Sequence, residues 1–262
     1  MKQTPAQQTA LAFSNNNSII QLDKLEFGGV VMRVGIICAG DEEVAPFLPI
    51  IDKCQISEKA MLKFYEGQIN GVDIVTLFSG VCKVNAAVAA QILIDTYGAE
   101  IIINAGVAGG MDEKLDIFDS AISTEVAYHD VAPDILTEFH PWMETVYFKA
   151  DPRLLQLSRQ AVSRLDLAGN VYWGRMVTGE AFIADEGRQT IKEQFAPLSV
   201  DMETASIAHV CYVNNVPFIA VRSITDTATH SGVGHFEENC PKASAIAKDI
   251  TVALLAELRD NQ

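Results

Sequence analysis

Residues 32–44 read MRVGIICAGDEEV, and this stretch sets the pattern for the rest of the chain. Its apolar part, 32–38, is typical of a buried strand, and the small residues after it lead into the start of a helix. Such a junction often holds a phosphate, because glycines let the backbone approach and helix N–H groups attract anions. Here Asp41, Glu42 and Glu43 follow one another, and their charges repel phosphate. The stretch therefore predicts a strand–loop–helix unit whose loop has another chemical task.

The alternation of strands and helices continues to the end of the chain. Further strand-like segments lie at 71–80, 100–110, 120–130, 170–179 and 217–225. Helix-like segments lie at 84–98, 151–166, 185–195, 203–215 and 242–261. Strands rich in Val and Ile that alternate with helices predict an α/β domain whose sheet is covered on both faces. No internal repeat or linker interrupts 32–262, so we expect one domain there.

Composition narrows the class of protein. The 262 residues are 49% hydrophobic and 20% charged, with a formal net charge of −15. This charge disfavours nucleic acid as a partner, because binding its backbone requires clustered Lys and Arg. No apolar run approaches the ~20 residues of a membrane span. We therefore expect a soluble protein that handles small molecules, with neither nucleic acid nor membrane as a partner.

The N-terminal residues and the cysteines indicate the compartment. Residues 1–31 begin as a polar segment without a continuous apolar core, so they do not resemble a secretory signal. We expect 1–31 to be an extension without fixed structure, followed by a domain over 32–262. The five cysteines are scattered, and no C-x-x-C occurs, which favours reduced thiols. The expected location is the cytoplasm.

Acidic side chains follow three different strand-like segments. Glu43 follows the first, Glu203 follows the short stretch Ser199-Val200, and Asp226 follows 217–225, with Arg222 inside that last segment. A glycine-rich run occupies 106–110. In α/β sheets, ligands bind at the carboxyl ends of the strands. Together these residues predict a binding site, although single acids after strands also cap helices, as Asp41, Glu42 or Asp201 could do here.

Other kinds of site have weaker signals. His129-Asp130 and His209-x-Cys211 offer metal ligands, but neither H-E-x-x-H nor a paired-cysteine spacing occurs. The run GVAGGM is not G-x-G-x-x-G at the start of a helix, so a nicotinamide cofactor is disfavoured. A serine hydrolase of the nucleophile-elbow type needs G-x-S-x-G, which is also missing from the sequence.

Five motifs resemble one family closely. In order they are MRVGIICAGDEEV, NAGVAGG, VTGEAFI, SVDMETASIAHVC and VPFIAVRSITDTA. This series resembles the 5′-methylthioadenosine/S-adenosylhomocysteine nucleosidases of the nucleoside phosphorylase superfamily, from about Met32 to the last helix. The resemblance implies a single α/β domain with a central mixed, largely parallel twisted sheet flanked by helices. It also implies a homodimer, and neither a cofactor nor a metal ion.

The resemblance implies a role for individual residues. Asp226 matches the acid that protonates N7 of adenine, and Glu43 matches the base that activates water. Substrate-binding roles fall on six further residues: Met202 and Glu203 at the ribose, Phe182 stacked on adenine, Ile183 bound to the base through its backbone, Gly109 near sugar and base, and Arg222 near the water.

The implied reaction is hydrolysis of the N-glycosidic bond of methylthioadenosine and adenosylhomocysteine, which releases adenine. The acidic loop favours water over phosphate as the attacking group, because a phosphorylase needs cations around its dianionic substrate. Two alternatives stay open, a purine nucleoside phosphorylase and a nucleosidase for another 5′-substituted adenosine, such as 5′-deoxyadenosine or aminofutalosine. Val107, Cys82 and the segment 131–148 depart from the common pattern. The resemblance implies that this segment helps to form the pocket for the 5′ substituent, so the 5′ group of the substrate is left open.

Overall fold

The computed structural model describes residues 32–184 and 186–261, so the expectation for residues 1–31 lies outside the described part. The strands are β1 (Arg33–Cys38), β2 (Asp52–Lys59), β3 (Leu62–Ile69), β4 (Val72–Phe78), β5 (Ile101–Gly110), β6 (Ser120–Tyr128), β7 (Phe148–Lys149), β8 (Val171–Thr178), β9 (Ser199–Asp201) and β10 (Phe218–Asp226). The helices are α1 (Asp41–Val44), the 3₁₀ turn η1 (Leu48–Ile50), α2 (Lys83–Asp95), α3 (Pro133–Glu138), α4 (Pro152–Val162), α5 (Arg188–Phe195), α6 (Thr204–Asn214) and α7 (Val233–Asp260).

The strands form one mixed sheet, which confirms the predicted fold class. Their order is β10-β6-β8-β9-β5-β1-β4-β3-β2, with β7 paired to β6. Because β10 also pairs with β5, the strands β10, β6, β8, β9 and β5 close into a ring, and β1, β4, β3 and β2 extend from it. Among these pairings, β1–β4, β1–β5, β5–β10, β6–β8 and β8–β9 are parallel.

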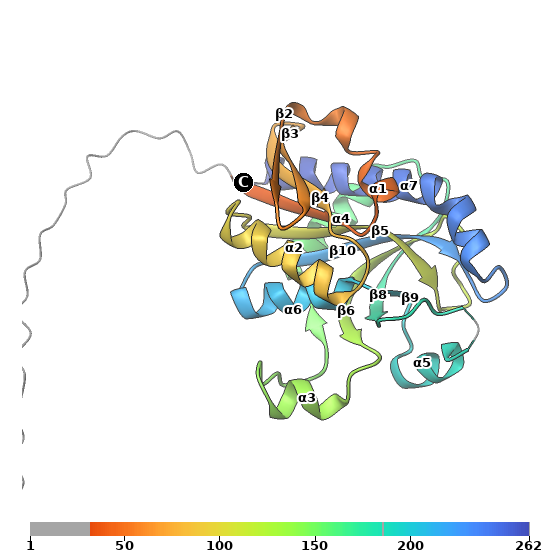
Figure 1. The fold of residues 1–262 in the computed structure, drawn as a ribbon. Helices are drawn as coiled ribbons and strands as arrows, with labels where there is room; N and C mark the ends of the chain where they lie inside the picture. The colour runs from red at the N-terminus through yellow and green to blue at the C-terminus, as the bar shows by residue number, and fades with distance from the viewer. Residues whose placement is uncertain (1–31, 185, 262) are drawn as a thin grey trace, which may run out of the picture. The chain divides into compact units, whose positions relative to one another are not determined.

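Two layers of helices cover the sheet, as the strand composition predicts (Figure 1). Alternate residues of β1, β5 and β10 point to opposite faces, because side chains alternate along a strand. On one face Ile36, Ile103 and Val221 pack in a core with α4 and α7. On the other face Ile37 and Ile102 pack in a core with α2 and α6. The strands at the centre are therefore buried on both sides.

The main differences from the predicted elements have physical reasons. The hairpin β2–β3 was not predicted, since β2 is almost entirely exposed at the sheet edge and its sequence DKCQISEK is polar. The last helix begins at Val233 rather than at 242, with Pro241 inside it. A proline removes one helical hydrogen bond but does not by itself mark the start of a helix.

The sheet topology brings the predicted strand ends to one place. β1 and β10 both pair in parallel with β5, so the carboxyl ends of these strands lie at the same edge. Thr178 at the end of β8 is the register partner of Asp201 at the end of β9. No helix in the described residues is both long enough and apolar enough to span a membrane.

Candidate active site

A cavity of about 490 Å³ lies at these strand ends. Its walls come from the β1–α1 loop, the end of β5, the β8–α5 loop, the β9–α6 junction, the end of β10 and the start of α7. Most of the predicted site residues line it, namely Glu43, Gly109, Phe182, Ile183, Met202, Glu203 and Asp226. Arg222 is fully buried and is not part of the lining. Segments far apart in the sequence are thus brought together around one space.

Glu43 is held rigidly at the inner end of α1. One carboxylate oxygen, Oε2, accepts hydrogen bonds from the backbone N–H of Ala39 and of Gly40, the latter at 2.9 Å. The other, Oε1, accepts one from the N–H of Val107 at 2.7 Å. A β-carbon at Gly106 would lie only 2.2 Å from Oε1, so only glycine fits beside this carboxylate. Three donors and one glycine therefore fix its orientation.

Arg222 links three carboxylates behind the cavity. Its guanidinium lies 3.4 Å from Glu43, 3.0 Å from Asp201 and 3.3 Å from Glu203. Burial opposes the charge of this guanidinium, but the three carboxylates raise the pKa of Arg222 above its ordinary value. The cation is therefore neutralised by its own neighbours, and it orients Glu43 and Glu203 from behind.

Asp201 does more than the predicted helix cap. Its Oδ1 accepts hydrogen bonds from the N–H groups of Glu203 and Thr204, as a capping side chain would. Its Oδ2 accepts one from Nε of Arg222, and Asp201 also lines the cavity. Only the capping role was predictable from the sequence, because the contact with Arg222 joins two strands that are far apart in the chain.

Glu203 is buried and points toward the same cluster. Burial raises its pKa to about 7, against the lowering effect of Arg222. Its Oε1 accepts a hydrogen bond of 3.0 Å from the backbone N–H of Cys82. Cys82 has a φ of 82°, in the left-handed region that favours glycine. Cys82 stands where the common pattern has glycine, but its backbone keeps the glycine-like conformation. Its N–H therefore still donates to Glu203.

Asp226 lies at the end of β10 and is 1% exposed. Oδ1 accepts a hydrogen bond of 2.9 Å from the Thr225 hydroxyl, whereas Oδ2 receives none from the described residues. Burial raises the pKa of this carboxyl, and the Thr225 bond and the charges of Arg188 and His235 oppose that rise. Asp226 thus combines a raised pKa with an oxygen in the cavity wall, Oδ2, that accepts no hydrogen bond from the described residues and lies 3.8 Å from Arg188.

One wall of the cavity is aromatic. Phe182 is 40% exposed and meets Phe236 of α7 edge to face, with ring centroids 6.1 Å apart. A β-carbon at Gly109 would lie 3.0 Å from Oδ2 of Asp226, so this glycine leaves the carboxyl accessible. Phe236 was missed in the sequence because the last helix was predicted to begin after it.

Cations near the cavity are already paired. Lys83 is the first residue of α2, and its amine lies 2.9 Å from Asp130 and 3.9 Å from Glu180. No lysine or arginine is among the described residues that line the cavity. Seven carboxylate residues do line it: Asp41, Glu42, Glu43, Asp201, Glu203, Asp226 and Glu237.

The histidines considered as metal ligands lie in other environments. His209 stacks on Phe148 with ring centroids 5.0 Å apart, and burial lowers its pKa. His129 lies beside Gly179, where a β-carbon would come within 2.2 Å of Nε2. Within the described residues, no group of three or more His, Cys, Asp or Glu side chains is arranged to hold a metal ion.

Comparison with known proteins shows the family to which the chain belongs. The family model described as the phosphorylase superfamily matches residues 33–256. A 5′-methylthioadenosine/S-adenosylhomocysteine nucleosidase of Staphylococcus epidermidis is 38% identical over 229 residues, which cover 86% of this chain and 99% of that protein.

Solved structures give the same result. The nucleosidase of Colwellia psychrerythraea 34H in complex with adenine superposes with a TM-score of 0.80 at 30% identity, over 87% of this chain and 96% of its own. The nucleosidase of Neisseria meningitidis in complex with methylthio-immucillin-A has a TM-score of 0.78 at 28% identity, over 85% and 98% of the two chains.

Proposed function

The chain belongs to the 5′-methylthioadenosine/S-adenosylhomocysteine nucleosidase family of the phosphorylase superfamily, and we propose from this that it hydrolyses the N-glycosidic bond of these two nucleosides. The products are adenine and the corresponding thioribose. The cavity of about 490 Å³ suits a nucleoside, since small-molecule sites measure roughly 300–1,000 Å³.

Asp226 is the proposed general acid. An adenine that leaves with its bonding electrons would carry a negative charge, and protonation of N7 removes this obstacle. The group that donates must therefore hold a proton near neutral pH, which burial favours for a carboxyl. The raised pKa of Asp226 supports this role, as does its Oδ2, which accepts no hydrogen bond from the described residues. Phe182 would stack on the base, and the backbone of Ile183 would hydrogen-bond to it.

Glu43 is the proposed general base at the ribose end. Gly106 adjoins Glu43 and Gly109 adjoins Asp226, and both glycines lie on β5. A strand rises about 3.3 Å per residue, so the two glycines lie roughly 10 Å apart along β5, and both carboxylates line the same cavity. A purine nucleoside can lie between them, with N7 toward Asp226 and the anomeric carbon toward Glu43. Glu43 would then accept a proton from the attacking water.

The ribose contacts complete the proposal. The sugar becomes cation-like at the anomeric carbon as the bond breaks, and carboxylates in a dry site stabilise such charge. Glu203 would grip the sugar hydroxyls, with Met202 against the ring and Gly109 near sugar and base. Arg222 would act from behind the cavity, by holding Glu43 and Glu203 in place rather than by contacting the water as a lining residue.

The composition of the cavity lining favours hydrolysis over phosphorolysis. Among the described residues, the lining holds seven carboxylate residues and no lysine or arginine. Phosphate is a dianion at neutral pH and would need cations around it. The nearby cations Arg222, Lys83 and Arg188 all lie against carboxylates, so they are not available for this purpose. Water has no such requirement.

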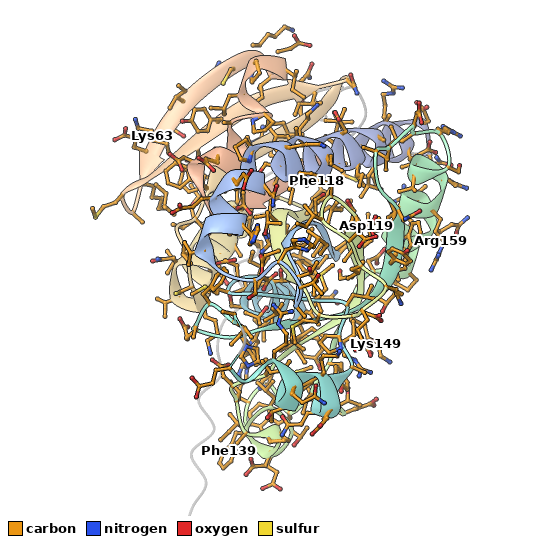
Figure 2. All side chains as sticks on the ribbon, turned by 90° about the vertical axis from the view of Figure 1, so that its right-hand side faces the viewer. Lys63, Phe118, Asp119, Phe139, Lys149 and Arg159 are labelled. Carbon is orange, nitrogen blue, oxygen red and sulfur yellow. The ribbon has the colours of Figure 1, made fainter. Side chains whose placement is uncertain are left out.

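A homodimer is part of the proposal. We define the α2–α6 patch as Val84, Val88, Tyr212 and Val213, which are 42–72% exposed. The two helices lie side by side (Figure 1), and hydrogen bonds between Gln91 and Asn214 join them. Phe139, also exposed, projects at the lower end of Figure 2. Apolar groups on adjoining elements mark protein interfaces.

The proposed setting of the reaction is methionine salvage in the cytoplasm.

The test is release of the free base, which is hypoxanthine for inosine and adenine for the other nucleosides, from a panel at equal concentration, with and without phosphate. The panel contains methylthioadenosine, adenosylhomocysteine, 5′-deoxyadenosine, aminofutalosine and inosine. We expect the first two to have the highest kcat/KM and inosine to be inert. Adenine release from aminofutalosine or 5′-deoxyadenosine alone would replace the proposed substrates, and phosphate-dependent cleavage of inosine would replace the reaction class.

A further inference from the structure

Arg188, the first residue of α5, is one of the most buried charged side chains outside the carboxylate cluster around Arg222. It is 6% exposed, although it begins a helix whose other residues are mostly solvent-facing. Placing a guanidinium in such surroundings is costly unless it makes several hydrogen bonds. The hydrogen bonds that Arg188 makes therefore indicate its role.

The guanidinium joins two walls of the cavity. Nε donates to the carbonyl of Ala184 at 2.8 Å, and Nη2 donates to that of Ile183 at 3.4 Å. On the other side, Nη1 donates to the carbonyl of Gly110 at 2.5 Å. The first two carbonyls belong to the loop that carries Phe182, and the third is at the end of β5. A planar fork of donors suits such a link, because it fixes direction as well as distance.

The same guanidinium lies beside the proposed acid. Nη2 is 3.8 Å from Oδ2 of Asp226, the oxygen that receives no hydrogen bond from the described residues. Other groups also face Asp226: the Thr225 hydroxyl on its own strand and His235 on α7, while β5 presents Gly109 and no titratable group. Glu203, Asp201 and Glu237 line the cavity farther around.

We propose that Arg188 is a positioning residue of the site, which fixes the adenine-binding loop against β5 and serves as the counter-ion of Asp226 once that carboxyl has given its proton to the base. This inference rests on the proposed function. The O–H bond of Asp226 breaks, the proton passes to N7, and the electron pair stays on the carboxylate. The carboxylate formed is buried, and Arg188 is the cation next to it.

Two consequences follow from the two contacts. Without the cation, the buried carboxylate is uncompensated, so Asp226 holds its proton to a higher pH and releases it less readily. Without the hydrogen bonds of the guanidinium, the loop that carries Phe182 and Ile183 loses its link to β5, and adenine binds less tightly. A residue that served only the stability of α5 would change neither quantity.

The experiment compares the wild type with Arg188→Met, Arg188→Lys and a matched control, Arg175→Met. Arg175 is also a partly buried arginine that holds α5, through the carbonyl of Phe195, and it pairs with Glu125 at 2.7 Å. Arg175 is not among the lining residues. For each protein, the pH profile of kcat/KM for methylthioadenosine is measured, together with the affinity for adenine by calorimetry.

For Arg188→Met we expect kcat/KM to fall by about tenfold or more, and the alkaline limb of the profile to move up by about one pH unit. Arg188→Lys keeps the charge, so its alkaline limb stays near that of the wild type, while adenine binds more weakly. Arg175→Met keeps the profile and the adenine affinity of the wild type.

An unchanged alkaline limb in Arg188→Met would overturn the counter-ion role, and unchanged adenine affinity in both variants would overturn the link to the loop. If Arg188→Met does not fold, Arg188→Lys decides alone: a moved limb in this charge-preserving variant contradicts the proposal. A wild type that cleaves none of the nucleosides would refute the proposed function instead, so the two failures are distinguishable.

Discussion

Two carboxylates at the same cavity have opposite surroundings. Glu43 accepts hydrogen bonds from three backbone N–H groups and lies 3.4 Å from the guanidinium of Arg222. Asp226 accepts one hydroxyl bond and lies 3.8 Å from Arg188, but burial outweighs both and raises its pKa. Two carboxyl groups that line one cavity but have such different surroundings are typical of an acid–base pair. The proposed division of roles, with Glu43 as the base and Asp226 as the acid, therefore rests on the neighbours of each residue.

Asp226→Asn tests the acid. The amide cannot give a proton to N7, so we expect kcat/KM for methylthioadenosine to fall by roughly 10²–10⁴. The side chain keeps its shape, and the melting temperature should stay close to that of the wild type. Steady-state kinetics and thermal denaturation on the same samples separate the two effects. Full activity in a folded variant would show that another group protonates the base.

Glu203 makes stability depend on pH. Its folded-state pKa of about 7 is above the ordinary value of 4.5, so between these values the folded state binds more protons than the unfolded state. The stability of the ligand-free protein should therefore fall as the pH rises from about 5 to 8. Glu203→Gln should flatten this slope. Melting temperatures measured across the range check this, and equal slopes in the two proteins would refute the assignment.

At the scale of elements, β5 is the strand on which the site is built. It pairs with β1, β9 and β10, and its glycines adjoin both proposed catalytic carboxylates. The open space beside these glycines is as important as the acids themselves, because the carboxylates occupy the volume that a side chain would need.

Gly106→Ala tests this packing. Its β-carbon would lie 2.2 Å from Oε1 of Glu43 and 2.6 Å from Nη1 of Arg222, so both groups must move. A displacement of about 1 Å can cost on the order of 100-fold in rate, and we expect a loss of this size in kcat/KM. Gly234→Ala is the control, since its β-carbon would meet nothing within 4 Å. Equal activity of the two variants would mean that Glu43 is not held as described.

The elements that the sequence predicted well are those with a strong local signal. The buried V/I-rich strands and the Ala-rich helix over 84–98 appear as β1, β4, β5, β10 and α2, within a few residues at their ends. The exposed hairpin β2–β3 lacked that signal, and closure of the ring by β5–β10 pairing depends on contacts between distant segments. Arg188 was missed for the same reason, because a basic residue at the start of a polar helix normally faces solvent.

At the scale of the whole molecule, the α2–α6 patch predicts association. The wild type should have about twice the mass of the 28.5 kDa chain in light scattering after size exclusion. Val84→Glu places a charge in the patch and should shift the protein toward the monomer. Met61→Glu is the matched control, because Met61 is fully exposed on the β2–β3 hairpin. A monomeric wild type would contradict the proposed dimer.

The central claim is that the acidic cavity selects water as the attacking group. The most direct measurement follows adenine release from methylthioadenosine in phosphate-free buffer and again with phosphate added, and identifies the sugar product in both. We predict free methylthioribose at the same rate under both conditions. A sugar 1-phosphate that forms only when phosphate is present would contradict the account.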